Sequence, residues 1–474
     1  MRLRNGLWLV AVAAGCATAV PRPIDPARAG EDFLARSLDD PGLAAYVAAN
    51  AAAPVAFPPA EWDLPALTLV AFYYHPELDV ARAAVAVAQA AEVTAGAIPN
   101  PSIGVGGEFH AGPSTSGTPW TFGFSFDIPI ETAGKRGYRV AHAERLTDVA
   151  RVELAEAAWA VRSRLRAALV DHLLAVKESD AAAAEHDARS RQAELIARLM
   201  DVGEASRPDL DQARTETARA ALEARTAAGR IDATRAVLAA ALGLPVAALE
   251  GVAFAWPDLE APPSPGALDP AAVQREGLLN RLDLHRVLAE YAAAEADLQL
   301  AVANQYPDVH IGTGWSWDQN DNKIALGISV PLPIFDQNQG PIAEAEARRA
   351  EVAARFDALQ ARAVGEIDLA LARVRAAMDE LAEADTLVAA VGAQTAGVER
   401  LFAAGAEDAL AVAGARVQAA AVARARVDAV RKVQEAVGAL EDALQRPVDG
   451  EANPNGVPPP DPGRASPADE EEAP

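Results

Sequence analysis

The chain has 474 residues, of which 51% are hydrophobic but only 5% aromatic, so alanine supplies much of the apolar content. Chains rich in alanine, glutamate, arginine and leucine usually form long helices, because these side chains lose little entropy in a helix. The net charge of −25 excludes nucleic acid as a partner, since a phosphate backbone needs a basic face.

The first 16 residues have the pattern of a bacterial lipoprotein signal peptide. Residues 1–5 are basic, residues 6–12 are apolar, and Ala13-Ala14-Gly15-Cys16 follows. This order is typical of a lipobox, in which the cysteine is acylated and becomes the mature N-terminus. We therefore expect a lipid on Cys16, the only cysteine of the chain; the alternative is an ordinary signal peptide in which this cysteine is incidental.

The rest of the sequence contains an internal repeat, present in two copies. Pro101 recurs as Pro307, 206 positions later, and Gly203 recurs as Gly405, 202 positions later. A spacing that drifts so little predicts a tandem duplication, because shared composition alone does not keep an offset constant. We expect an N-terminal linker at 17–60 with one helical stretch near 31–50, repeat 1 at 61–250 and a proline-rich linker at 251–270. Repeat 2 follows at 271–447, and a disordered acidic tail at 448–474.

Each repeat carries one predicted β-hairpin. Residues 120–130 alternate strictly between apolar and small or polar side chains, and residues 324–334 repeat the pattern. Period two over eleven positions predicts a strand. A weaker strand precedes each of them, at 103–109 and 309–317, after which come residues typical of turns.

Long helices account for most of the remainder. Proline is absent from 135–202, and the second copy of this stretch runs over about 342–404. Helices of such length would be roughly 90–100 Å long, which suits a coiled, tube-like assembly. Gly203 and Gly405 lie where a long helix must stop and turn. Shorter helices are expected beside them, at about 60–98, 206–242, 269–304 and 408–445.

The predicted strands are long enough to cross a membrane, at about ten residues each. Their alternation predicts that Phe124 and Ile328 face lipid while Ser125 and Ser329 face a lumen. Four strands cannot close a barrel, since outer-membrane barrels begin at about eight, and open edges in lipid are costly. Two, three or four copies would therefore have to join. A soluble sandwich corner with long helices attached remains the alternative.

Two segments resemble a known family. One is Asp-Ile-Pro-Ile-Glu at 127–131, which leads to Gly-Lys-Arg at 134–136; the other is Val-Pro-Leu-Pro-Ile-Phe-Asp-Gln-Asn-Gln-Gly at 330–340. With the repeated order of helices and hairpin, the chain is similar to the TolC-like outer-membrane efflux family over about 60–447. The two segments are most similar to its heavy-metal branch, the cobalt–zinc–cadmium type. The resemblance implies a mainly α fold with membrane β-structure, in which a long α-helical tunnel joins four strands per chain of a trimeric twelve-stranded β-barrel.

The resemblance also implies a function. It predicts a homotrimeric channel subunit of a tripartite efflux pump that exports heavy-metal cations from the periplasm. The partners would be a periplasmic adaptor protein, an inner-membrane pump of the resistance–nodulation–division class, and outer-membrane lipid. The protein would be lipid-anchored in the bacterial outer membrane, with a large periplasmic part. A channel for drug efflux or type I protein secretion, or a lipid-anchored periplasmic coiled-coil scaffold, remain alternatives.

The helix tips are the predicted periplasmic entrance. The family closes this end partly with acidic residues six and nine positions after the second turn glycine, where this chain has Ala411 and Gly414. Rings of carboxylates in a narrow pore favour cations. The candidate gate residues are four nearby acids and two possible arginine donors, Asp209, Asp211, Glu407, Asp408, Arg207 and Arg416. The alternative is that these are solvated charges at the ends of helices.

No segment of the sequence suggests an enzyme. It has no glycine-rich phosphate loop and no nucleophile motif, and its seven histidines are scattered. We therefore expect no catalytic residue, no cofactor other than a lipid on Cys16, and no metal site within a local segment.

Overall fold

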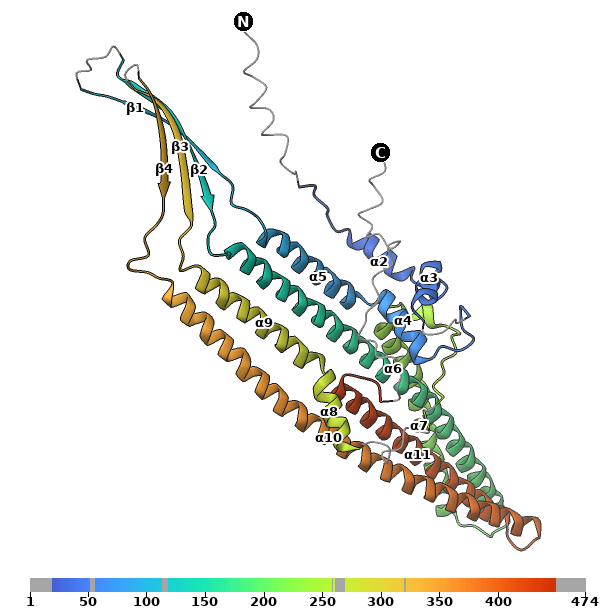
Figure 1. Ribbon diagram of the computed structural model, residues 1–474. Coiled ribbons are helices and arrows are strands. Elements are labelled where there is room, and N and C mark those ends of the chain that lie inside the picture. The colour runs from blue at the N-terminus through green and yellow to red at the C-terminus, as the bar shows by residue number, and fades with distance from the viewer. Residues whose placement is uncertain are drawn as a thin grey trace.

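The computed structural model describes residues 19–51, 56–112, 118–257, 259–260, 269–318 and 321–448. The predicted signal peptide with Cys16, and all but the first residue of the predicted acidic tail, lie outside these ranges. The described chain is elongated, with a small sheet at one end and two long helical hairpins that reach the opposite end (Figure 1).

Both repeats follow the same order of elements. A short helix and a longer one lead into a hairpin, a very long helix and a returning helix. In repeat 1 these are α4 (Leu64–Tyr74), α5 (Pro76–Ala95), β1 (Ser102–Phe109), β2 (Trp120–Ile130), α6 (Lys135–Asp201) and α7 (Arg207–Leu242). In repeat 2 they are α8 (Pro270–Asn280), α9 (Leu282–Ala303), β3 (Val309–Asp318), β4 (Asp321–Ser329), α10 (Gln339–Ala403) and α11 (Ala409–Leu444).

Two of the four shorter helical stretches, at 60–98 and 269–304, are each broken where one continuous helix was expected. The stretch at 60–98 divides at His75, which is extended because the next residue is Pro76, and proline disfavours the helical region for the residue before it. The stretch at 269–304 divides at Arg281, which is also extended although no proline follows it. Contacts made by the Arg281 side chain, described below, account for this second break.

The segment expected as an N-terminal linker folds into two helices, α2 (Pro26–Leu34) and α3 (Pro41–Asn50), where one helical stretch was expected. Asp25 and Asp40 cap them through hydrogen bonds to backbone N–H groups. Helix α3 then buries Leu43 completely in a core shared with α4, α6 and α7. A second core joins α6 to α8, α10 and α11, so both cores depend on the longest helix of repeat 1.

The four strands form one antiparallel sheet in the order β1-β2-β3-β4. Phe124 stands opposite Val105 on one side and Trp315 on the other, while Ser125 stands opposite Gly104 and Gly314. Because side chains alternate along a strand, these registers give one continuous apolar face and one continuous face of small and polar residues. Strand β4 ends at Ser329, five residues before the alternating pattern ends in the sequence.

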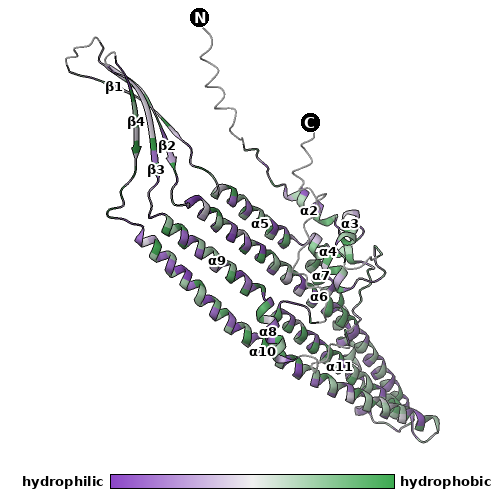
Figure 2. Cartoon of the chain, in the orientation of Figure 1, coloured by the Kyte–Doolittle hydropathy of each residue, from purple (hydrophilic) through white to green (hydrophobic). Residues whose placement is uncertain are grey.

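Hydrophilic and hydrophobic residues are interleaved along the long helices (Figure 2). None of the described helices is long and apolar enough to cross a membrane.

Candidate functional site

The two helix tips lie at the end of the molecule opposite the sheet (Figure 1). Gly203 follows α6 and Gly405 follows α10, with φ of +82° and +75°, a region that glycine enters without strain. The next residue in each turn donates its N–H to a helix carbonyl: Glu204 to Leu199 at 2.8 Å, and Ala406 to Leu401 at 2.9 Å. Both repeats therefore reverse direction by the same glycine-dependent turn.

The first tip is held by local hydrogen bonds. Ser206 caps α7, and Asp209 completes the capping box by accepting the Ser206 N–H at 3.0 Å and its hydroxyl at 2.6 Å. These hydrogen bonds lower the pKa of Asp209. Arg207 and Asp211 form an exposed ion pair at 3.1 Å one turn apart. Both predicted acids of this tip thus have a local structural role in the chain.

The second tip is similar. Asp408 caps α11 by accepting the N–H of Ala411 at 2.7 Å. Arg416 pairs at 2.7 Å with Glu399 of α10, an acid that the sequence reasoning did not single out. Glu407 is exposed. The structure therefore brings the predicted tip charges to one end of the molecule, but their contacts are within each hairpin, and a gating role stays a prediction.

A groove of about 790 Å³ opens beside this tip between α6, α10 and α11. Its wall includes Asp187 and Arg191 of α6, together with Glu399 and Arg416. Small residues such as Ala409 and Ala413 of α11 leave the space open. The groove lies between the two helical hairpins, close to the tips.

Ion pairs join the two helical hairpins farther from the tips. Asp171 and Glu178 of α6 each contact both Arg230 of α7 and Arg431 of α11, with N–O distances of 2.6–3.0 Å. Two acids against two guanidinium groups form a closed network, which is stronger than separate exposed pairs. The network fastens repeat 2 onto repeat 1. One signal of this network was visible beforehand: the two acids are seven residues apart, which places them on one face of α6.

A second link lies closer to the tips. Arg424 of α11 contacts Glu185 of α6 at 3.0 Å and also pairs with Glu223 of α7. Burial opposes ionisation of Glu185, but hydrogen bonds from Arg424 and Arg189 outweigh it and lower the pKa of this carboxyl. Glu185 therefore stays charged in the ordinary pH range and holds the second hairpin against the first.

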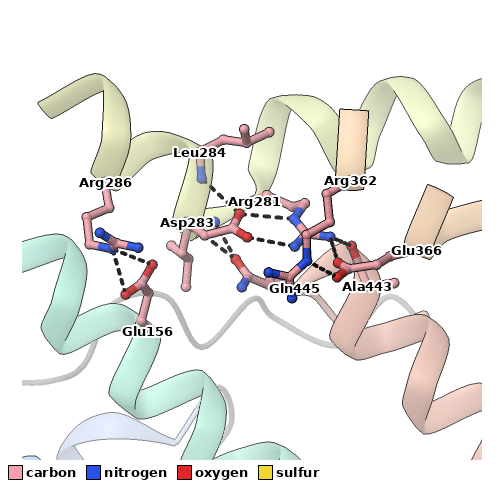
Figure 3. Close-up of polar contacts among 10 residues, drawn as sticks. Glu156, Arg281, Asp283, Leu284, Arg286, Arg362, Glu366, Ala443 and Gln445 are labelled. Atoms are coloured by element: carbon pink, nitrogen blue, oxygen red, sulfur yellow. Dashed lines mark hydrogen bonds and ion pairs between the residues drawn. The ribbon is translucent and has the colours of Figure 1, made fainter. Parts of the chain in front are cut away.

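The break between α8 and α9 forms a charged corner around the buried Arg281 of repeat 2 (Figure 3). Arg281 is 4% exposed and donates to Asp283 at 2.6 Å, to Glu366 of α10 at 2.9 Å and to the carbonyl of Ala443 at 2.9 Å. Gln445 accepts the N–H of Leu282 at 2.5 Å, beside the same corner. These contacts hold α8, α9, α10 and the end of α11 together.

Arg286 continues from this corner toward repeat 1. Its guanidinium contacts Glu156 of α6 at 3.2 Å, as Figure 3 shows, so α9 is tied to the long helix of the other repeat. Near the sheet, Lys135 at the start of α6 is buried and pairs with Asp308 at 2.8 Å. Asp308 also accepts the N–H of Thr132 at 3.0 Å. The Gly-Lys-Arg segment thus fixes the corner where strand β2 becomes helix α6.

The polar face of the sheet carries charged groups near both ends. Near its helical end, His310 Nδ1 lies 2.9 Å from Asp127 Oδ2. Near the hairpin end, Thr121 donates to Asp318 at 2.7 Å and contacts His110, while Lys323 pairs with the same carboxylate. Between them the face is lined mainly by glycine, serine and alanine. No group of three or more His, Cys, Asp or Glu that could hold a metal ion occurs within the described residues of the single chain.

Known proteins resemble this chain in sequence and in fold. The model of the family "Outer membrane efflux protein" matches residues 71–244 and 274–445. The cobalt–zinc–cadmium resistance protein CzcC of Cupriavidus metallidurans is 33% identical over 216 residues. This similarity covers 45% of the chain and 50% of CzcC, so the chain spans half the length of that relative.

Solved structures share the architecture. The outer membrane protein VceC of Vibrio cholerae matches 80% of this chain and 95% of its own, with a TM-score of 0.64 and 20% identity. CusC, whose structures are described as showing conformational changes that accompany folding and transmembrane channel formation, matches 80% of this chain and 91% of its own, with a TM-score of 0.64 and 18% identity. Both likenesses show a common fold. The matching family model describes efflux proteins, which transport and do not catalyse, as the sequence predicted.

Proposed function

Because this chain belongs to the outer membrane efflux protein family, we propose that it is the outer-membrane conduit of a pump that exports divalent heavy-metal cations. The observation that carries the choice of substrate is the 33% identity with the cobalt–zinc–cadmium resistance protein CzcC. A conduit needs a continuous passage and no chemistry. The elongated shape, with a sheet at one end and helix tips at the other, suits such a passage.

The proposal includes association of copies, which the internal repeat supports. Helix α9 packs against both α10 of its own repeat and α6 of the other repeat, whereas α5 packs mainly on α6. Helix α5 is the counterpart of α9 in repeat 1. Its side equivalent to the side of α9 that faces α6 bears Val80 and Val87, which are exposed and lie two turns apart. An equivalent contact would form if this side of α5 packed against α10 of another copy. We propose three copies, the number implied by the family resemblance, which gives twelve strands and a closed barrel.

The remaining parts of the proposal concern the two ends and the lipid. The helix tips would face a periplasmic adaptor and an inner-membrane pump of the resistance–nodulation–division class. Asp209, Asp211, Glu407 and Asp408 would give this entrance a negative charge that favours cations. A lipid on Cys16 would anchor the start of the chain. Mass spectrometry of the mature protein tests the lipid, since an unmodified Cys16 or a mature start elsewhere would contradict it without affecting the channel.

Deletion of the gene in its host tests the function. We expect the deletion strain to lose tolerance to Zn²⁺, Co²⁺ or Cd²⁺, and the native gene to restore it. Tolerance to a panel of drugs is measured in parallel. A deletion strain that becomes sensitive to drugs and not to metals would contradict the substrate, while absence of the assembled protein from the outer membrane of the complemented strain would contradict the conduit itself.

A further inference from the structure

One histidine on the polar face of the sheet, His310, is held by a neighbouring carboxylate. His310 Nδ1 lies 2.9 Å from the carboxylate of Asp127, and its side chain is 38% exposed. A carboxylate at this distance accepts the Nδ1 proton, so the lone pair of the neutral ring lies on Nε2. A histidine oriented by a carboxylate in this way is the arrangement that metal-binding histidines use. Nε2 has no hydrogen bond to any residue in the described chain.

Nε2 points away from Asp127, because the two ring nitrogens face nearly opposite directions. Asp127 belongs to β2, on one side of His310. On the other side Ser329 of β4 stands directly opposite His310. The ring nitrogen that could bind a ligand is thus directed toward the free edge of the sheet, where the single chain supplies only a small hydroxyl side chain.

The internal repeat predicts what would lie beyond that edge. Within the chain β2 pairs with β3 in a known register, in which Ser125 stands opposite Gly314. The residues equivalent to these are Ser329 in β4 and Glu108 in β1. If two copies join as the two repeats do, Ser329 of one copy stands opposite Glu108 of the partner subunit.

The apolar face supports this register independently. Phe124 stands opposite Trp315 within the chain, and the equivalent pair between copies is Ile328 of one copy with Phe109 of the partner subunit. Likewise Ile128 stands opposite Ile311, and the equivalent pair is Leu332 of one copy with Val105 of the partner subunit. These four positions are apolar, and Leu332 is 75% exposed in the single chain, just beyond the point where β4 ends. A shift by one residue would place these apolar side chains on the polar face. Pairing with the partner would extend β4 to the length of β2.

The register has a chemical consequence on the polar face. Neighbouring strands lie about 4.8 Å apart, so Glu108 of the partner subunit is about 10 Å from His310, across Ser329. A glutamate and a histidine can both reach over a serine of this size toward a point between them. In the single chain Glu108 is exposed and forms no ion pair with any described residue. An oriented imidazole and a carboxylate would therefore meet only at the junction of two copies.

We propose that each junction between copies forms a weak binding site for a divalent metal cation, made by His310 of one subunit and Glu108 of the partner subunit, with Asp127 orienting the histidine. The inference rests on the proposed function, since it needs the copies to associate and the polar face to line a passage. One nitrogen and one carboxylate oxygen suit borderline cations such as Zn²⁺ and Co²⁺. Two protein ligands bind loosely, which a conduit requires, because a passing ion must also leave.

The other histidine of this face does not make an equivalent site. His110 lies near Asp318, but Lys323 already pairs with that carboxylate and supplies a positive charge there. The ammonium group repels a second cation. The helical end of the polar face is therefore the part that can hold a metal.

Disulfide crosslinking of purified full-length protein tests the register. The double variant Ser329→Cys with Glu108→Cys should give linked dimers and trimers on denaturing gels after mild oxidation. The matched control, Ser329→Cys with Gly106→Cys, displaces one partner by two residues on the same face and should link poorly. A control that links as well as or better than the predicted pair would overturn the register and the site with it.

Zn²⁺ binding to the assembled protein tests the site. Equilibrium dialysis of the native oligomer should find one Zn²⁺ per chain, with an affinity that falls about tenfold in Glu108→Gln and in His310→Gln, in line with the loss of a group that holds a metal. Asp321→Asn removes a carboxylate near the hairpin tip and should bind like the native protein. Unchanged binding in both site variants would overturn the site. Metal tolerance of the host separates the two proposals: if the native protein restores tolerance but binds no Zn²⁺, the conduit stands and the site does not.

Discussion

Phe124→Arg tests the assignment of the two faces of the sheet. Phe124 lies one residue from the middle of β2, with ring centroids 5.8 Å from Trp315 and 5.9 Å from Phe126. An arginine on a lipid-facing strand near the middle of the bilayer costs about 2–4 kcal/mol. Loss of two aromatic contacts adds about 1–3 kcal/mol. Three copies would triple the penalty for the assembled barrel, so we expect little oligomer in outer-membrane fractions on semi-native gels.

Ser125→Arg is the matched control. It adds the same charge at the next residue, on the opposite face of the sheet. Its cross-strand neighbours are Gly104 and Gly314, which leave room for the longer side chain. An arginine there would extend into a water-filled lumen and should leave the amount of oligomer unchanged. Equal loss in both variants, or equal tolerance of both, would show that the two faces are assigned wrongly.

Three further predictions concern the helical part. Arg281→Met removes a guanidinium group from the partly buried Asp283 and one of the two that contact Glu366, and should lower the free energy of unfolding by about 2–4 kcal/mol, seen as a lower thermal midpoint; a change below about 1 kcal/mol would contradict the role of this corner. Burial lowers the pKa of His172, so stability is full above the ordinary histidine pKa and falls as the pH drops toward the folded value; His172→Gln should flatten the decline of the thermal midpoint between pH 7 and pH 5. Joint neutralisation of Glu407 and Asp408 should reduce the cation preference of single-channel currents in planar bilayers, whereas neutralising Glu346, partway along α10, should not; unchanged selectivity in the tip variant would mean that these are surface charges.

Periodic features of the structure could be predicted from the sequence, because they depend on neighbouring residues. The strict alternation around Phe124 and Ile328 identified the hairpins and the side chains that share a face. Absence of proline identified α6 and α10, and Gly203 and Gly405 marked the turns. Each of these signals is a local rule of backbone geometry, and the constant offset between the repeats strengthened it by showing each signal twice.

Features that depend on distant partners could not be predicted in this way. The break at Arg281 depends in part on Glu366 and a carbonyl of α11, which lie far along the chain. The network of Asp171 with Arg230 and Arg431 requires a choice among 42 Lys and Arg residues that the sequence does not make. The tip acids were recognised as charges, but the capping of α7 and α11 that Asp209 and Asp408 provide became evident only with the turn geometry.

The interface between the two repeats of one chain and the proposed interface between copies differ in chemistry. Within the chain, the repeats meet through ion pairs such as Lys135 with Asp308 and Arg286 with Glu156. At the positions equivalent to Lys135 and Arg286, which would lie at the junction between copies, the chain has the uncharged Gln339 and Val80.

This difference follows from the physical requirements of each interface. Covalent linkage already keeps the repeats close, so an ion pair there mainly fixes their alignment at little cost in association entropy. Separate copies must offset the loss of free movement on assembly, and burial of apolar area is the contribution that can do so. The exposed Val80, Val87, Leu332 and Ile334 lie on the surfaces that a second copy would cover. Changes of salt or pH would then act mainly on the contacts between repeats, including those that hold the two hairpins near the tips, while the apolar contacts keep the copies together.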